Sequence, residues 1–420
     1  MMGNLTTRGL LKRMNRRSLI KFLFCFFIFI CDAKGQVITN YNTGNSPLPF
    51  NSVRCLEVHN SGLWIGTDVG LAQLENDQWE VYNAINSPLY SDDIRAIKSD
   101  GDTLLWIGTV QGGLFSFNGS EWTNYNIANS GLLDNLIRHI DIDQNGNIWL
   151  ATTEGIFMYD RSNWHHWNMQ ENGLLTNNIT SIEIGLHNEK YVGTINGGII
   201  YFDSINQFTQ YTIINSSLPD NSIVDIEIDQ NGQPWFISPA AGLVNDSNLG
   251  GPWINYNNLN SGLPSNSLNC LIFTNNQLIL GSEVSGLVFK DNDNWQSMNT
   301  SNSNLPDNHI LSIQVDDSKN IWAGTFNAGL CKISLQNGIE NGKQNSLLFY
   351  PNLITSGQEI QMKDSFTGSI QLVNRMGEII DSQMIYNQNK WTIPRSASRG
   401  LYYVTLTNQN TSFTRPLMVY

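Results

Sequence analysis

Charged residues are scarce in this chain of 420 residues, since Asp, Glu, Lys and Arg together make up only 14% of it. Long amphipathic helices depend on residues such as Glu and Lys, so a helical protein is not expected. Asn, Gly, Ser and Trp are plentiful, which favours short strands joined by polar turns. The charges that are present give a formal net charge of −13. An acidic protein repels phosphate groups, so we expect no nucleic acid partner.

Cysteines and long apolar runs are also few. Two of the five cysteines lie within the first 35 residues, which leaves Cys55, Cys270 and Cys331. An odd, low count does not suit a disulfide framework, so these three are expected to be small buried side chains. The apolar run Phe22–Cys31 is about half as long as a helix that spans a bilayer. We therefore expect no transmembrane helix in the mature chain.

Residues 1–35 have the features of a secretory signal peptide. Basic residues precede the apolar run, and Ala33 and Gly35 occupy the two positions that a signal peptidase recognises. This pattern predicts cleavage between Gly35 and Gln36. A membrane anchor is the alternative, and either Met1 or Met14 can be the start.

One phrase, "LWIGT" followed by a Gly-rich turn, recurs along most of the chain at steps of 42 to 44 residues. Its central position is occupied in turn by Trp64, Trp106, Trp149, Tyr191, Trp235, Ile279 and Trp322. Each unit divides into four short strand-like pieces and ends in a loop such as "NSGLP". Seven units of this length predict an all-β fold, a seven-bladed β-propeller over residues 36–335.

The seventh unit ends before its fourth strand. The missing strand is found at the other end of the propeller, because "TNYN" at residues 39–42 is identical to the fourth strand at residues 123–126. We therefore expect the N-terminal strand to complete the last blade and close the ring, which leaves no long sheet edge open.

The repeated "LWIGTxxGGLxxF", the following Trp and the "NSxLPxN" loop resemble the two-component regulator propeller repeat. In that family, the propeller often forms the periplasmic sensor of a hybrid histidine kinase that responds to polysaccharide fragments. This chain departs from that arrangement, because no kinase and no helical dimerisation segment follow its propeller.

A second domain follows a polar stretch at residues 336–346 that is typical of a linker. Residues 347–420 are again strand-like and predict a small C-terminal β-sandwich. The residues 350–352, the "VNRMGEII" hairpin and the "GLYYV" strand resemble the C-terminal sorting domain of the type IX secretion system. The resemblance implies a protein that is secreted or held on the outer surface of a Gram-negative bacterium, with the secretion machinery as a partner of this domain, which is removed on export.

No catalytic, metal-binding or cofactor-binding motif stands out, so we expect no metal, no cofactor and no catalytic residue. Alignment of the seven units places three arginines at the start of consecutive first strands, on one side of the propeller mouth. They indicate a site for an anionic or polar ligand, because Arg forms bidentate hydrogen bonds. The predicted site consists of Arg54, Arg95, Arg138, His139, Gln111, Asn196 and Asp225. The alternative is structural: each Arg pairs with a nearby carboxylate such as Asp93 or Asp134.

These features together favour a secreted or cell-surface binding module for a glycan or another polar ligand. Two alternatives stay open. The first is a propeller-type hydrolase or lyase, which needs His or carboxylate side chains that converge at the ring mouth. The second is an accessory component of the type IX secretion and attachment machinery.

Overall fold

The computed structural model describes residues 36–419 apart from eight short gaps: 204–206, 246–251, 275–276, 293, 336–348, 351–352, 375–377 and 408–411. The predicted signal peptide and the predicted linker at residues 336–346 lie outside the described residues. The chain divides into two compact units between Leu335 and Gln336. Within the described residues, no helix has the length and apolar character needed to cross a membrane.

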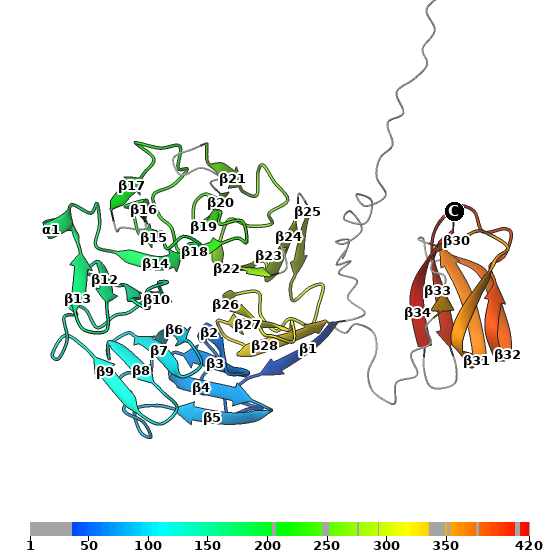
Figure 1. Cartoon of the computed structure of the whole chain (residues 1–420), viewed down its shortest axis with the longest axis horizontal. Helices are drawn as coiled ribbons and strands as arrows, with labels where there is room; N and C mark the ends of the chain where they lie inside the picture. Colours follow the sequence, from blue (N-terminus) through cyan, green and yellow to red (C-terminus); the bar gives the residue numbers. More distant parts are fainter. Residues whose placement is uncertain are drawn as a thin grey trace, which may run out of the picture. The chain divides into compact units, whose positions relative to one another are not determined.

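The first unit is built from four-stranded antiparallel sheets, seven of them in the described part of the chain. They surround a common centre (Figure 1). From the innermost strand outward the first four are β2 (Val53–His59), β3 (Gly62–Thr67), β4 (Gly70–Glu75), β5 (Gln78–Tyr82); β6 (Ile94–Asp100), β7 (Leu104–Thr109), β8 (Leu114–Phe117), β9 (Trp122–Tyr125); β10 (His139–Ile142), β11 (Ile148–Ala151), β12 (Ile156–Tyr159), β13 (Trp164–Trp167); and β14 (Ile179–Ile184), β15 (Lys190–Thr194), β16 (Ile199–Phe202), β17 (Phe208–Tyr211). The other three are β18 (Asp225–Ile228), β19 (Pro234–Ser238), β20 (Gly242–Asn245), β21 (Ile254–Tyr256); β22 (Leu268–Thr274), β23 (Gln277–Ser282), β24 (Leu287–Asp291), β25 (Asn294–Met298); and β26 (Ile310–Val315), β27 (Ile321–Thr325), β28 (Leu330–Leu335), β1 (Gln36–Tyr41). The prediction of an all-β propeller is confirmed.

The innermost strands form a closed ring. Each of them contacts the innermost strand of the next sheet, and β26 contacts β2. The outermost strand of the last sheet comes from the start of the propeller, because β1 pairs antiparallel with β28. Tyr41 of β1 also stacks on Trp322 and meets the edge of Trp79 in the first sheet. The first and last sheets are thereby joined through one strand.

Each sheet is linked to the next by a return loop that side chains hold in shape. In the loop after β9, the Asn126 N–H donates to Asn129 Oδ1 at 2.8 Å, and Ser130 Oγ donates to the Asn126 carbonyl at 2.7 Å. The Ile127 N–H donates to Asn135 Oδ1 at 3.0 Å. The Leu of each loop is buried, at Leu48, Leu89, Leu132, Leu174, Leu218, Leu263 and Leu305. The "NSxLPxN" motif is therefore a turn framework with an apolar anchor.

The loop after β13 contains the short helix α1 (Met169–Asn172), which Asn168 caps by accepting from the Glu171 N–H. The glycine before each third strand is needed for space. A Cβ on Gly113 would lie 2.3 Å from the Tyr125 carbonyl oxygen, and φ there is +80°. Glycine is the residue that tolerates both conditions.

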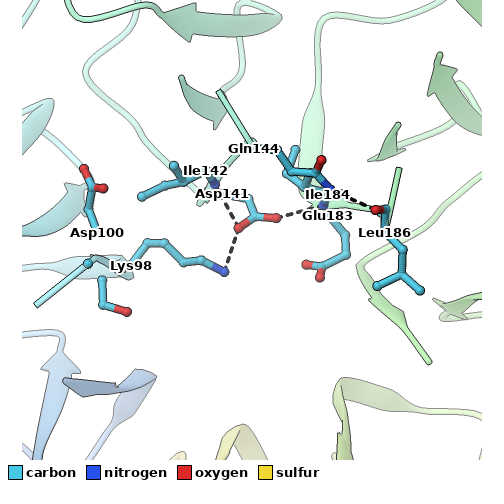
Figure 2. Close-up of a pocket in the computed structure, with 11 residues that line it drawn as sticks. Lys98, Asp100, Asp141, Ile142, Gln144, Glu183, Ile184 and Leu186 are labelled. Atoms are coloured by element: carbon cyan, nitrogen blue, oxygen red, sulfur yellow. Dashed lines mark hydrogen bonds and ion pairs between the residues drawn. The ribbon is translucent and has the colours of Figure 1, made fainter. Parts of the chain in front are cut away.

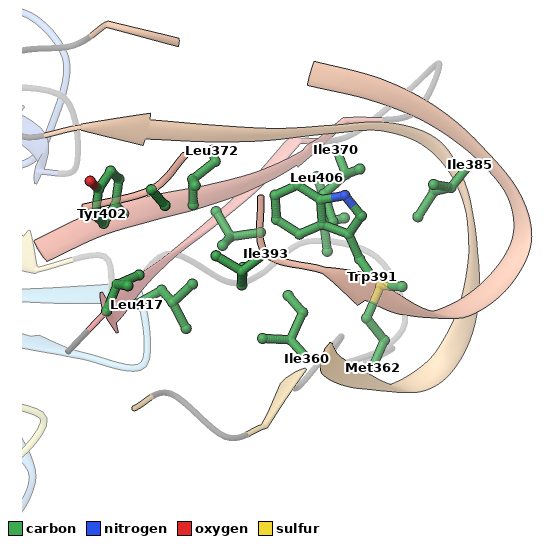
Figure 3. Close-up of a cluster of buried hydrophobic side chains, with 13 residues drawn as sticks. Ile360, Met362, Ile370, Leu372, Ile385, Trp391, Ile393, Tyr402, Leu406 and Leu417 are labelled. Carbon is green, nitrogen blue, oxygen red and sulfur yellow. The ribbon is translucent and has the colours of Figure 1, made fainter. Parts of the chain in front are cut away.

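The C-terminal unit is also built of strands. Its elements are β29 (Phe349–Tyr350), β30 (Leu353–Ile354), β31 (Glu359–Asn374), β32 (Ile379–Thr392), β33 (Gly400–Thr407) and β34 (Ser412–Val419). They form one connected sheet in which β31 pairs with β29, β32 and β33. The register of β31 shifts at several places, which lets this long strand bend. Its core, which includes Trp391 and Tyr402, lies between the curved strands (Figure 3).

Candidate functional site

The predicted arginines lie at the beginning of the inner strands, and two of them are paired with carboxylates. Arg54 makes a bidentate pair with Asp68, with Nε–Oδ1 at 2.5 Å and Nη2–Oδ2 at 2.9 Å. Arg95 pairs with Asp93 at 2.8 Å and approaches Asp68 at 3.8 Å. Burial would raise the pKa of Asp68, but the hydrogen bonds and charge of Arg54 outweigh it and lower that pKa. Much of the positive charge on this face is therefore compensated within the protein.

Arg138 has neutral partners in the next sheet, the Asn178 side-chain oxygen and the Ile179 carbonyl at 3.0 Å. Burial lowers the pKa of its guanidinium. The suggested partner Asp134 instead accepts hydrogen bonds from Thr153. Other inner strands use the same position similarly, since Thr180 Oγ1 donates to the Ile223 carbonyl at 2.6 Å and Asn269 to the Ile310 carbonyl at 2.8 Å. This position therefore ties each inner strand to the next, and Arg138 shares that role.

The other four predicted residues are spread around the ring. Gln111 is exposed, and Asn196 is exposed and bonded to Ser222. His139 and Asp225 lie further along their strands and accept from backbone N–H groups of the next strands, Ile182 at 3.4 Å and Leu271 at 3.0 Å. Burial lowers the pKa of His139 and raises the pKa of Asp225 to about 7.

A second set of polar side chains lies deeper in the propeller. One register position on the inner strands is always paired with the residue that occupies the central position of the "LWIGT" phrase. We call these seven residues the inner ring. They are Glu57, Lys98, Asp141, Glu183, Glu227, Ile272 and Gln314.

Contacts within the inner ring run from one sheet to the next. Glu57 Oε1 accepts from the backbone N–H and the hydroxyl of Ser99, at 2.9 and 2.5 Å. Lys98 Nζ lies 2.6 Å from Asp141 Oδ1, and Asp141 Oδ2 accepts from the Ile184 N–H at 2.8 Å. These bonds satisfy backbone donors on the exposed edges of the inner strands.

A cavity of about 400 Å³ opens where β6, β10 and β14 end. We call it the inner-strand cavity. Figure 2 shows Lys98, Asp141 and Glu183 facing the open space between these strands, with no bond drawn to the Glu183 carboxylate. The cavity lies at the opposite ends of the inner strands from the three arginines. It is lined by Lys98, Ser99, Asp100, Gly101, Asp141, Ile142, Gln144, Glu183, Ile184, Gly185 and Leu186.

The inner ring contains unusual carboxylates. Burial, together with the charges of Asp141 and Glu227, raises the pKa of Glu183. Burial and the charge of Asp225 raise the pKa of Glu227 to about 8. Burial alone would lower the pKa of Lys98, but the Asp141 and Glu183 carboxylates outweigh it and raise that pKa. Perturbed groups gathered at a cavity are a common mark of a functional site.

Sequence reasoning did not find this cavity. Alignment of the inner strands was carried only to the first two positions, and the inner ring lies two residues further along each strand. A signal was present, because five of its seven members are charged in a chain where charge is scarce.

Two family models match parts of the chain. Residues 304–327 match the two component regulator propeller, and residues 348–420 match the secretion system C-terminal sorting domain. The chain carries a regulator propeller repeat and a C-terminal sorting domain. A sorting domain marks a secreted or cell-surface protein and implies contact with the secretion machinery. A comparison with curated proteins gave no match.

Solved structures with the same fold come from several kinds of protein. One is the extracellular domain of BT3049 from B. thetaiotaomicron, described as a hybrid two component system (19% identity, TM-score 0.61, 91% of this chain and 57% of that one). Another is PorZ, a surface component of the type-IX secretion system of Porphyromonas gingivalis (17% identity, TM-score 0.60, 88% of this chain and 60% of that one). Virginiamycin B lyase from Staphylococcus aureus is a third (14% identity, TM-score 0.58, 71% of this chain and 99% of that one).

At these identities the similarity concerns the fold alone. The chain spans 57% and 60% of the lengths of the first two structures. One fold therefore occurs in sensors, secretion components and enzymes, and the function of this chain depends on its own side chains.

Proposed function

We propose that the protein is a secreted or cell-surface binding module whose propeller holds a polar ligand, such as a glycan, in the inner-strand cavity. The observation that carries the proposal is the cavity itself. Its volume of about 400 Å³ is within the range of small-molecule sites, and charged and apolar side chains line it together.

The face with the three arginines is the second place at which a ligand can bind. Arg54 and Arg95 already bond to carboxylates, so an anion would have to displace these partners. Arg138 has neutral partners and is the better anchor there. We favour the inner-strand cavity because its carboxylates include one without a bonded partner, as described below.

Export by the type IX secretion system is the other part of the proposal. The sorting domain supports it, and the resemblance implies that residues after about 346 are removed when the protein reaches the outer surface. The mature protein would then present the propeller alone to its ligand.

A pair of matched variants tests the site. Leu186 lines the cavity and is 52% exposed, and Leu133 is 62% exposed in a return loop on the arginine face. Leu186→Trp fills the cavity mouth, and Leu133→Trp makes the same change at the other face. We expect the purified protein to select a set of structures on a glycan array, and Leu186→Trp to abolish this selection while Leu133→Trp leaves it unchanged.

Other outcomes would change the proposal. Loss of binding in Leu133→Trp alone would move the site to the arginine face. Absence of selective binding by the folded protein would contradict the binding function. Turnover of a bound glycan would favour the hydrolase or lyase alternative.

A further inference from the structure

Glu183 differs from the other carboxylates of the inner ring in its bonding. Glu57 accepts from Ser99, and Asp141 accepts from the Ile184 N–H and pairs with Lys98. Glu227 accepts from the Phe273 N–H. Within the described part of the chain, no group donates a hydrogen bond to the Glu183 carboxylate. The carboxylate that lacks a donor is the one that faces the inner-strand cavity (Figure 2).

The surroundings of Glu183 have an excess of negative charge. Asp141, Asp225 and Glu227 act on it, and Lys98 is the cation that opposes them. Lys98 Nζ is held 2.6 Å from Asp141, so its charge is already directed to another carboxylate. Asp100, on the cavity wall, is likewise paired with Arg161 and accepts from the Trp106 indole. The protein itself supplies no cation for Glu183.

We propose that the inner-strand cavity binds an amino sugar, whose ammonium group pairs with the Glu183 carboxylate. The inference rests on the proposed function and names the class of ligand. An ammonium group supplies both the hydrogen-bond donor and the charge that Glu183 lacks. The sugar hydroxyls can bond to Gln144, Ser99 and the backbone at Gly101 and Gly185, which line the same cavity.

Protonation agrees with this arrangement. The raised pKa of Glu183 means that the empty site holds a proton where a ligand cation would sit. An ammonium group favours the ionised carboxylate, so binding should release this proton. The groups that face Glu183 and influence this step are Lys98, Asp141, Asp225 and Glu227. A metal ion is a poorer candidate, because no group of three possible ligands with suitable geometry is found among the described residues.

The test compares two sugars that differ in charge. Glucosamine carries the ammonium group, and N-acetylglucosamine keeps the nitrogen without the charge. Titration calorimetry on the whole protein at neutral pH should give at least about tenfold tighter binding of glucosamine, as expected for one charge-assisted bond. The same titration in two buffers of different ionisation enthalpy should show proton release.

Variants assign the effect to Glu183. Glu183→Gln keeps the shape and mimics the protonated side chain, so the fold should be retained, which thermal melting checks. It should weaken glucosamine binding about tenfold or more and remove the proton release. Glu121→Gln changes an exposed glutamate on the outer side of the second sheet and should have no effect.

The inference is wrong if the two sugars bind equally, if neither binds, or if Glu183→Gln binds glucosamine as the wild type does. Preference for Nα-acetyl-lysine amide over glucosamine would also overturn it, because the ligand would then be a peptide. If the glycan array identifies a neutral ligand whose binding needs the cavity but not Glu183, the proposed function stands and this inference fails.

Discussion

Replacement of Lys98 by Met tests whether the inner ring is an electrostatic network. Lys98 is the one cation among its seven members. The substitution keeps an apolar stem of similar length and removes the charge that Asp141 and Glu183 share. Removal of one partner from a buried ion pair typically costs about 3–5 kcal/mol. The Lys98 side chain is 35% exposed and Asp141 only 5%, so solvent screening reduces the expected loss of stability to about 2 kcal/mol near pH 8.

The loss should depend on pH in a defined direction. The pKa of Glu227 in the folded protein is about 8, above its usual 4.5, so the folded state binds more protons than the unfolded state between these values. Stability therefore falls as the pH rises from 5 to 8. Lys98 opposes this fall because it lowers the pKa of Glu183 and Glu227. In Lys98→Met the fall should be steeper, and the difference from the wild type should be larger at pH 8 than at pH 5.

Urea unfolding measures the effect, with tryptophan fluorescence as the probe. Every tryptophan except Trp391 lies in the propeller, so the signal reports on that unit. Lys332→Met is the control, because Lys332 stacks over Trp322 away from the inner ring. Lys98→Met/Asp141→Asn should recover about half of the loss, since it removes the carboxylate left without a partner. Equal losses at both pH values, or no recovery in the double variant, would refute the argument.

Three further predictions follow from single contacts. Asp316→Ala should lower the free energy of unfolding by about 1–3 kcal/mol, because the Trp322 indole N–H donates to Asp316 at 2.8 Å and would lose a buried acceptor; the exposed neighbour Asp317→Ala should change it little, and equal effects in urea unfolding would contradict this. Deletion of residues 36–41 should markedly lower the urea midpoint of the propeller, because β28 loses its partner strand; an unchanged midpoint would show that β1 adds no stability. Mass spectrometry of protein recovered from the cell surface should find Gln36 at the N-terminus and no peptide from residues 350–420, and an intact C-terminus there would favour a role within the secretion machinery.

Much of the propeller is evident in the sequence because each repeat states the same local rules. The central aromatic of the phrase, the glycine before the third strand and the Leu of the return loop recur with little change. They fix the strands, the turns and the buried anchors independently of distant contacts. The side-chain bonds in the return loops also explain why Asn and Ser are so common in this chain.

The candidate site was harder to predict, because its residues meet only after the ring is formed. Lys98 and Asp141 are 43 positions apart in the sequence, and nothing local indicates that they touch. The arginines drew attention because they recur at one aligned position in three consecutive units. Recurrence in a repeat protein often reflects a bond that every unit needs, and the contacts of Arg138, Thr180 and Asn269 show such a bond.

Departure from the repeat is the more informative signal. An inner strand is an edge strand, so its backbone N–H groups need acceptors from the preceding sheet. Glu57, Asp141 and Glu227 supply such acceptors, and their polarity is explained by the fold. Glu183 occupies the same register position, yet it accepts no such bond within the described residues. A buried charge that serves no neighbour is costly to the fold, so its presence beside a cavity is best explained by a ligand.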